Sequence, residues 1–444
     1  MNALPSRRLV RRIAPAFRRF LLAALAWPGI AAACALPAPD GPHPVGFQRF
    51  ELTDDARRGL GGEAADVPRT LPAAVWYPAE AAGAGRAYLS PAEAEVQLPA
   101  LARNLRYAPE SVAALGGCRA PDTEGAAPAQ AASRFPLVVL SHGFYSYPLQ
   151  NTALAGALAS HGYVVVALGH PGDSADVRLA DGRLVPTNMA AEKPEFLAWR
   201  HAFHSASAHA ARARLIDGYG EALAGSRLGA SVEVWRDDVL FAVRALQAGD
   251  VPAPVRPVLA AADAGRLAIA GMSFGGSTAA SACRRLPACR AAISLDGLNF
   301  DPELFDADLQ RPLLLMLGDW VRFPMYDGLP SEAGFNPNDY AYERWEAAGL
   351  SPDVLRVRVP GTRHMSFTDL PLLMAGEGLE AHFGDADPPA VAGAIAAASR
   401  AFLDVHLKGA DPAALPRAIE AGGLVRHDPR QTRAWARSRS GEQP

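Results

Sequence analysis

Five short apolar runs in the middle of the chain limit the fold more than any other feature. The runs are FPLVVLSHG, YVVVALGH, RLAIAG, AAISLDG and PLLLMLGD, and each ends at a Gly, His or Asp. Continuous apolar runs of this length are typical of strands that are buried on both faces of a parallel sheet. Helix-like segments follow the runs, among them LAGALASHG, VEVWRDDVLFAVRALQ and AVAGAIAAASRAFLDVHL. Strands that alternate with helices predict an α/β fold with a mostly parallel, doubly wound sheet.

The turn GMSFGG at residues 271–276 joins one predicted strand to a helix of small residues, STAASACRRL. In a chain with 40 glycines, a serine between two glycines is weak evidence by itself. The strand before it and the helix after it are the context in which a sharp, strained turn exposes a nucleophilic serine. We therefore predict that Ser273 is a nucleophile. The backbone N–H of Phe274, which follows it, is a predicted donor to developing negative charge.

A serine hydroxyl needs a base that takes its proton, and in this arrangement the chain order is Ser, acid, His. His364 follows the predicted strand VLRVRV and is our candidate for the base. His406 lies in the last predicted helix, and His382 and His427 follow no strand. These three are better explained as surface or packing histidines.

The residues alone leave two candidates for the acid, because Asp296 and Asp319 each end a predicted strand. Either side chain is also a normal cap of a loop. The second donor to negative charge is expected from the backbone of Phe144, in the loop after FPLVVLSHG, where Gly143 lets the chain turn. For His142 we expect a structural role in holding this loop.

A metal or cofactor is not predicted. His201, His204 and His209 in HAFHSASAH match no standard ligand spacing and have no acidic partner nearby, so we interpret them as a polar helix face.

The first 34 residues have the order of a secretory signal: six arginines, an apolar run and small residues before Cys34. The motif SRRLVRR also fits a twin-arginine signal, and a lipid anchor on Cys34 is an alternative. Loss of this leader would remove six of the 43 basic residues and none of the 46 acidic ones, moving the formal charge from −3 to −9. We therefore expect an exported protein with no nucleic-acid partner.

The remaining sequence predicts a single domain over residues 35–430 and a polar tail over 431–444. Insertions are expected near 81–134, where Ala, Gly and Pro predict loops and short helices, near 173–230 and near 323–350. We expect the last two to roof a pocket, with Phe196, Trp199, Phe203, Phe323 and Tyr326 as candidate wall residues. Cys283 and Cys289 are close enough to form a small disulfide loop, which would leave Cys118 unpaired.

From Pro44 to Leu407 the chain resembles the plasma-type platelet-activating factor acetylhydrolases and their bacterial relatives, near the dienelactone-hydrolase-like esterases of the α/β-hydrolase superfamily. The resemblance rests on the order and spacing of HPVGF, LVVLSHGF, ASHGYVVVALGH, GMSFGGSTA, ISLDG and GTRHMSFTDL. Two segments depart from the family pattern, 169–173 and 297–300, and we expect both to shape the substrate mouth.

The resemblance implies a catalytic triad of Ser273, Asp296 and His364, with Phe144 and Phe274 as oxyanion donors. It implies a serine carboxylic-ester hydrolase for short or oxidised acyl chains, with phospholipid acetyl esters as one substrate class. Contact with a lipid surface follows from that class, and the oligomeric state is left open. The alternatives are an amide or peptide hydrolase that uses the same triad, and a non-catalytic surface protein of the same fold.

Overall fold

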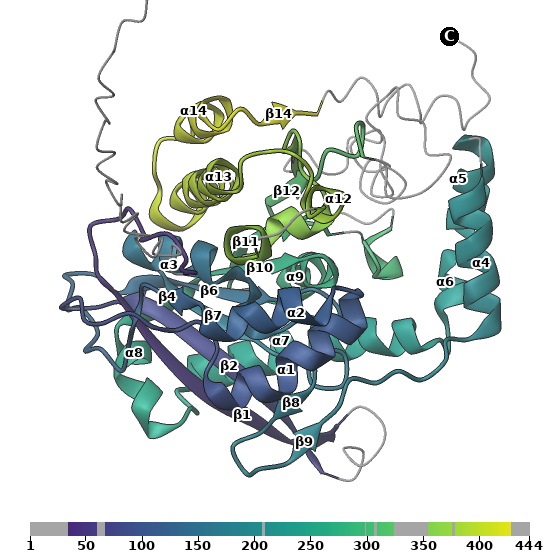
Figure 1. The fold of residues 1–444 in the computed structure, drawn as a ribbon. Helices are drawn as coiled ribbons and strands as arrows, with labels where there is room; N and C mark the ends of the chain where they lie inside the picture. The colour runs from purple at the N-terminus through teal and green to yellow at the C-terminus, as the bar shows by residue number, and fades with distance from the viewer. Residues whose placement is uncertain are drawn as a thin grey trace, which may run out of the picture. The chain divides into compact units, whose positions relative to one another are not determined.

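The computed structural model describes residues 34–59, 67–206, 209–297, 299–305, 309–323, 354–374 and 378–427. Residues 1–33 of the predicted leader, the polar tail and most of the 323–350 insertion lie outside these residues. Within them the main feature is a ten-stranded sheet with the order β14-β13-β12-β11-β10-β6-β7-β2-β1-β5 (Figure 1). The strands from β13 to β7 are all parallel, whereas β2 and β14 pair antiparallel to their neighbours β7 and β13.

Five of the strands, β6, β7, β10, β11 and β12, coincide with the five apolar runs of the sequence. In chain order the sheet strands are β1 (Val45–Arg58), β2 (Pro68–Pro78), β5 (Thr123–Glu124), β6 (Phe135–Ser141), β7 (Val164–Leu168), β10 (Ala262–Met272), β11 (Cys289–Leu295), β12 (Leu313–Leu317), β13 (Val354–Arg358) and β14 (Val425–Arg426). Two small ribbons pair β3 (Arg86–Ala87) with β4 (Arg119–Ala120), and β8 (Val177–Arg178) with β9 (Leu184–Val185). The predicted doubly wound α/β sheet is confirmed.

Successive residues of the central strands pack into two different apolar clusters, so the sheet is covered on both faces. In β6, Val138 and Leu140 join the cluster on one face, and Leu137 and Val139 join the other. The first cluster contains α3 (Thr152–Ser160), α11 (Leu370–Leu373), α13 (Pro388–Lys408) and α14 (Ala414–Ala421). The second contains α7 (Arg227–Ala248), α8 (Arg256–Ala260) and α9 (Phe274–Arg285). Helix α13 is long and apolar enough to cross a membrane, but it packs in the first cluster as a core helix.

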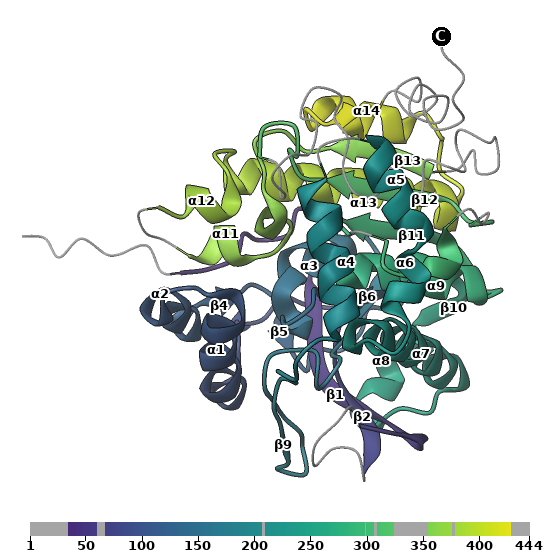
Figure 2. The ribbon, with the colours of Figure 1, turned by 90° about the vertical axis from the view of Figure 1, so that its right-hand side faces the viewer.

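Two insertions leave the sheet. The 81–134 segment is more regular than predicted, because it contains the 15-residue helix α1 (Pro91–Leu105) as well as the short α2 (Pro109–Ala113). A capping box between Ser90 and Glu93 starts α1, and this local signal was present in the sequence. The 173–230 insertion forms α4 (Pro194–Ser205), α5 (His209–Asp217) and α6 (Tyr219–Leu223), which lie side by side (Figure 2).

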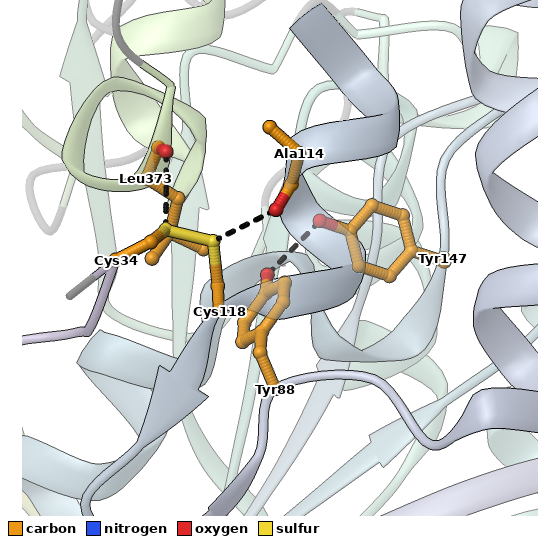
Figure 3. Close-up of a disulfide and its surroundings, with 6 residues drawn as sticks. All are labelled: Cys34, Tyr88, Ala114, Cys118, Tyr147 and Leu373. Carbon is orange, nitrogen blue, oxygen red and sulfur yellow. Dashed lines mark hydrogen bonds between the residues drawn. A yellow bond between two sulfur atoms is a disulfide. The ribbon is translucent and has the colours of Figure 1, made fainter. Parts of the chain in front are cut away.

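All four cysteines are paired. Cys283 and Cys289 form a disulfide, and Cys34 forms another with Cys118, beside Leu373 (Figure 3). The prediction that Cys118 is unpaired was therefore wrong. So was the lipid anchor on Cys34, because a sulfur atom in a disulfide has no free valence for a thioether.

Candidate active site

Ser273 lies on a strained turn between β10 and α9. Its backbone has φ 56° and ψ −120°, a conformation that is costly for a residue with a side chain. The two flanking glycines allow the turn. A Cβ on Gly271 would lie 2.0 Å from the Gly275 carbonyl oxygen, and a Cβ on Gly275 would lie 2.3 Å from that of Ser141. The turn therefore requires glycine at both positions, and it holds the Ser273 hydroxyl at the carboxyl end of the sheet.

The three predicted triad residues meet at this end of the sheet, although Asp296 lies 23 positions and His364 91 positions after Ser273. The Ser273 Oγ lies 2.9 Å from His364 Nε2, and His364 Nδ1 lies 2.7 Å from Asp296 Oδ2. His364 begins a short 3₁₀ turn, η8 (His364–Phe367), after β13. The side chain of His364 is 26% exposed and that of Asp296 only 1%, so the imidazole faces the solvent side and the carboxylate lies behind it.

Asp296 and not Asp319 is the carboxylate in contact with the imidazole. Its other oxygen, Oδ1, accepts hydrogen bonds from the Gly318 N–H at 2.7 Å and the Trp320 indole at 2.8 Å. Asp319 instead accepts from the Arg358 guanidinium at 2.6 Å and from the Gly361 N–H at 2.9 Å. Asp319 is thus a loop-holding residue, which was the second interpretation that the sequence allowed.

The loop after β6 lies next to the serine. A Cβ on Gly143 would be 3.3 Å from the Ser273 Cβ, so the two backbones are close. The Gly143 N–H donates to the Oε1 atom of the buried Gln150 at 3.1 Å, which fixes the start of the loop. In the described part of the chain, neither the Phe144 nor the Phe274 N–H donates to a protein acceptor. Both predicted donors are therefore free for an oxyanion.

A cavity of about 360 Å³ opens at Ser273 between the sheet and the α4–α6 insertion. Ser273, Phe144 and Phe274 line its base. Further aromatic residues line its walls: Phe196, Trp199, Phe203, Tyr219, Phe300 and Phe305. Three of the five predicted wall residues thus lie in it. Phe323 lines a smaller cavity on another side of His364, and Tyr326 lies outside the described residues.

We expected the histidines of α4 and α5 to form a polar helix face, and the side chain of His209 lies outside those that the structure describes. His201 is exposed and His204 lines the aromatic cavity. Among the described residues no group of three His, Cys, Asp or Glu side chains could hold a metal ion.

A buried network behind the loop was missed by the sequence interpretation. His170 is fully buried, with Nε2 3.2 Å from Ser141 Oγ and Nδ1 2.9 Å from Asp238 Oδ2. Asp238 is also fully buried and accepts two 2.6 Å hydrogen bonds from Arg69. We expected segment 169–173 to shape the substrate mouth, and for His170 this was wrong. Its partners come from β2, β6 and α7, which no local pattern links.

The His142 imidazole lies beside this network. Its Nε2 accepts the His170 N–H at 3.2 Å, and its Nδ1 is 2.7 Å from the Gly143 carbonyl. Burial and the neighbouring His170 lower the pKa of His142 to about 3, and burial also lowers that of His170. Both rings are therefore neutral at physiological pH. This geometry agrees with the structural role expected for His142.

Comparison with known proteins found similarity to one protein family and to a solved esterase structure. Residues 29–214 match the family model described as platelet-activating factor acetylhydrolase, isoform II. Among solved structures, a ferulic acid esterase from Streptomyces cinnamoneus is similar at 25% identity and a TM-score of 0.64, over 89% of this chain and 100% of that chain. No curated protein matches the chain.

The similarities confirm the resemblance that the motifs indicated and the α/β-hydrolase fold. The chain is, in general terms, a serine ester hydrolase. The matched range ends at residue 214, before Ser273, Asp296 and His364. Their roles are therefore argued from geometry.

Proposed function

We propose that the protein is a serine carboxylic-ester hydrolase that works through an acyl-enzyme. Ser273 Oγ attacks the ester carbonyl and passes its proton to His364 Nε2. The imidazolium then gives that proton to the leaving alcohol oxygen as the C–O bond breaks. Water repeats the sequence on the acyl-enzyme and releases the acid.

One observation carries this proposal: the 2.9 Å and 2.7 Å contacts that link Ser273, His364 and Asp296. The Asp296 carboxylate, held by two other donors, keeps the Nδ1 proton on its own side of the ring, so Nε2 is free to accept from the serine. The N–H groups of Phe144 and Phe274 are the proposed donors to the oxyanion of the tetrahedral intermediate.

The cavity favours a compact, apolar acyl group. Its walls are mostly aromatic, and Trp199 and Phe203 stack with an interplanar angle of 12°. Short or oxidised acyl esters, including acetyl phospholipids, fit this description and agree with the family resemblance. The aromatic walls also favour a second class, esters of aromatic acids, which agrees with the solved relative that is named a ferulic acid esterase.

Export is also part of the proposal. Two disulfides involve all four cysteines, and disulfides persist in oxidising compartments. The proposed partner is a small ester or a phospholipid substrate, with contact to a lipid surface in the second case and no nucleic acid.

A substrate panel tests the proposal. The panel contains p-nitrophenyl esters from acetate to palmitate, an oxidised phospholipid, methyl ferulate and a p-nitroanilide. We expect kcat/KM to fall by roughly tenfold or more from short esters to palmitate, since a single methylene group that a hydrophobic pocket cannot accommodate costs about tenfold or more. Equal activity on all chain lengths would contradict a compact acyl pocket, and faster cleavage of the anilide would favour the amide hydrolase.

A wall variant links the result to this cavity. Trp199→Ala removes a stacked wall residue, and we expect it to shift the preference toward longer acyl chains. Leu197→Ala is the matched control, because Leu197 lies on the same helix and is 38% exposed, outside the cavity lining. The same chain-length profile in both variants would argue against this cavity as the acyl site.

A further inference from the structure

In the loop after β6, the N–H groups of Gly143, Tyr145 and Ser146 donate hydrogen bonds within the protein. The Phe144 N–H has no acceptor among the described residues. The Tyr145 N–H donates to the Asp173 carbonyl at 2.7 Å, and the Ser146 N–H donates to the Gly143 carbonyl at 3.0 Å. The Phe144 N–H lies between these anchored groups. Its direction is set by ψ of Gly143 and φ of Phe144, and the anchored groups on both sides hold these two angles.

Tyr145 has an unusual backbone. Its φ of 66° is in the left-handed region, which is costly for a residue with a side chain and persists only where other contacts enforce it. The Tyr145 hydroxyl accepts a 2.6 Å hydrogen bond from Arg227 Nη2. Tyr145 is thus held at both ends, through its N–H and through its hydroxyl.

Arg227 is well placed to enforce this conformation. It is the first residue of α7, and its backbone N–H donates to the Glu192 carboxylate at 2.7 Å. Its guanidinium lies 5.2 Å from the centre of the Phe144 ring, in cation–π range. The contacts of Nη1 to Asp173 and to the Asn188 carbonyl are both 3.4 Å long, so the bond to Tyr145 is the shortest of the guanidinium.

Asp173 joins both parts of this arrangement. Its carbonyl accepts from Tyr145, one carboxylate oxygen faces Arg227, and the other accepts from the Trp235 indole at 3.0 Å. Trp235 in turn stacks on His170 at 3.8 Å, within the buried network. The anchor of the loop is therefore continuous with the core.

We propose that Arg227 and Tyr145 are positioning residues for the oxyanion hole. By holding the Tyr145 hydroxyl, the Arg227 guanidinium keeps Tyr145 in its left-handed conformation. Phe144 is then anchored on its carboxyl side as it is at Gly143 on the other, and the direction of its N–H is fixed. Neither side chain is required to touch the reacting atoms. This inference rests on the proposed esterase function and assigns a role within it to two residues that no sequence motif marks.

The test uses Tyr145→Phe, which removes only the hydroxyl, and Arg227→Met, which keeps an apolar stem. Each variant should lower kcat on p-nitrophenyl acetate by about 10- to 100-fold, because a small misplacement of a group at the reacting centre costs up to about 100-fold. KM should change less than about twofold, since the oxyanion forms only in the transition state. The double variant should lose no more than the worse single variant, because both act through one contact.

A second measurement distinguishes a positioning role from a merely structural one. The inhibition constant of a trifluoromethyl ketone, whose adduct places an oxyanion in the hole, should weaken by the same factor as kcat in both variants. Tyr145→Phe with wild-type kcat and wild-type inhibition, or a loss in KM alone, would overturn the proposal.

Two controls separate the possible failures. Tyr163→Phe removes another buried hydroxyl with a charged partner, bonded to Asp404 at 2.6 Å, and Arg183→Met removes an exposed arginine from the same insertion. Both should keep wild-type kcat. If the wild-type protein shows no esterase activity and no labelling at Ser273, the proposed function fails, whereas an active enzyme that is insensitive at Tyr145 and Arg227 contradicts this inference alone.

Discussion

Two hydrogen-bonded Ser–His–Asp triads begin at serines on neighbouring strands of this sheet. One is the proposed catalytic triad, and the other is part of the buried network. In one, Ser273, His364 and Asp296 are linked by contacts of 2.9 Å and 2.7 Å. In the other, Ser141, His170 and Asp238 are linked by contacts of 3.2 Å and 2.9 Å. Ser141 ends β6 and Ser273 follows β10, and these strands are neighbours, with Ser141 paired in register with Gly271.

Their surroundings separate them. Ser273 faces a cavity of about 360 Å³, whereas all three side chains of the second triad are buried at 1% exposure or less. Asp238 is also paired with Arg69 at 2.6 Å, and Trp235 stacks on His170 at 3.8 Å. The comparison teaches that the residue types and distances of a triad are not sufficient. Access for a substrate and donors for an oxyanion decide which triad can be catalytic.

The largest contrast is expected from the two serines. Ser273→Ala should lower kcat by about a million-fold, as loss of the nucleophile does in another serine hydrolase. Ser141→Ala removes one buried hydroxyl and should leave kcat within a few-fold, with a loss of about 1 kcal/mol of stability. Steady-state kinetics on p-nitrophenyl acetate measures both. Similar losses of kcat in the two variants would remove the distinction between the two triads.

The two aspartates should fail in different ways. Asp296→Asn should lower kcat by about ten-thousand-fold and keep the fold, because the amide favours the wrong tautomer of His364. Asp238→Asn should instead lower the free energy of unfolding by about 3–5 kcal/mol, because it leaves the buried Arg69 charge without its partner. Urea unfolding together with kinetics separates the two effects. A stable but inactive Asp238→Asn protein would contradict the structural role.

Stability should depend on pH through the histidines of the buried network. The folded pKa of His142, about 3, lies below its ordinary value because of burial and of the neighbouring His170. The unfolded chain therefore binds more protons as pH falls, so this contribution is complete above about pH 6.5 and is lost as pH decreases toward 3. Its slope is at most about 1.4 kcal/mol per pH unit.

The variant His142→Gln isolates this contribution. It matters that burial raises the pKa of Asp369 to about 8, which by itself makes stability decrease as pH rises. The informative quantity is thus the difference between wild type and variant in urea unfolding from pH 5 to 8. Below about pH 6.5 the variant should lose the part of the positive slope that His142 contributes, whereas the contribution of His170 remains. His201→Gln, on the exposed face of α4, should keep the wild-type slope. Equal slopes in His142→Gln and wild type would show that His142 is not buried and neutral.

The local parts of this account could be predicted from the sequence. The glycines around Ser273 are fixed by backbone crowding within a few residues, and the strand before His364 places it at the end of the sheet. The choice between Asp296 and Asp319 could not be made from the residues, because β11 and β12 are neighbours and an Asp follows each within two residues. Only the contact with the imidazole distinguishes them; the resemblance to a family had indicated Asp296.

Contacts between residues far apart in the sequence could not be predicted from it. The Cys34–Cys118 disulfide closes a separation of 84 residues, and the Arg69–Asp238 pair closes one of 169. No periodicity links such positions, since they depend on which strands become neighbours. Helix α1 is a different case, because its Ser90 and Glu93 capping box was readable and the Ala- and Pro-rich composition concealed it.

The most direct test of the central claim is to map a fluorophosphonate adduct on the native protein by mass spectrometry. The reagent bonds only to a serine that is activated by a base and open to a ligand. We expect one adduct, on Ser273, which is lost in His364→Ala and kept in His170→Ala if that variant folds. An adduct on Ser141, or no adduct on folded wild-type protein, would contradict the assignment of Ser273, His364 and Asp296 as the catalytic triad.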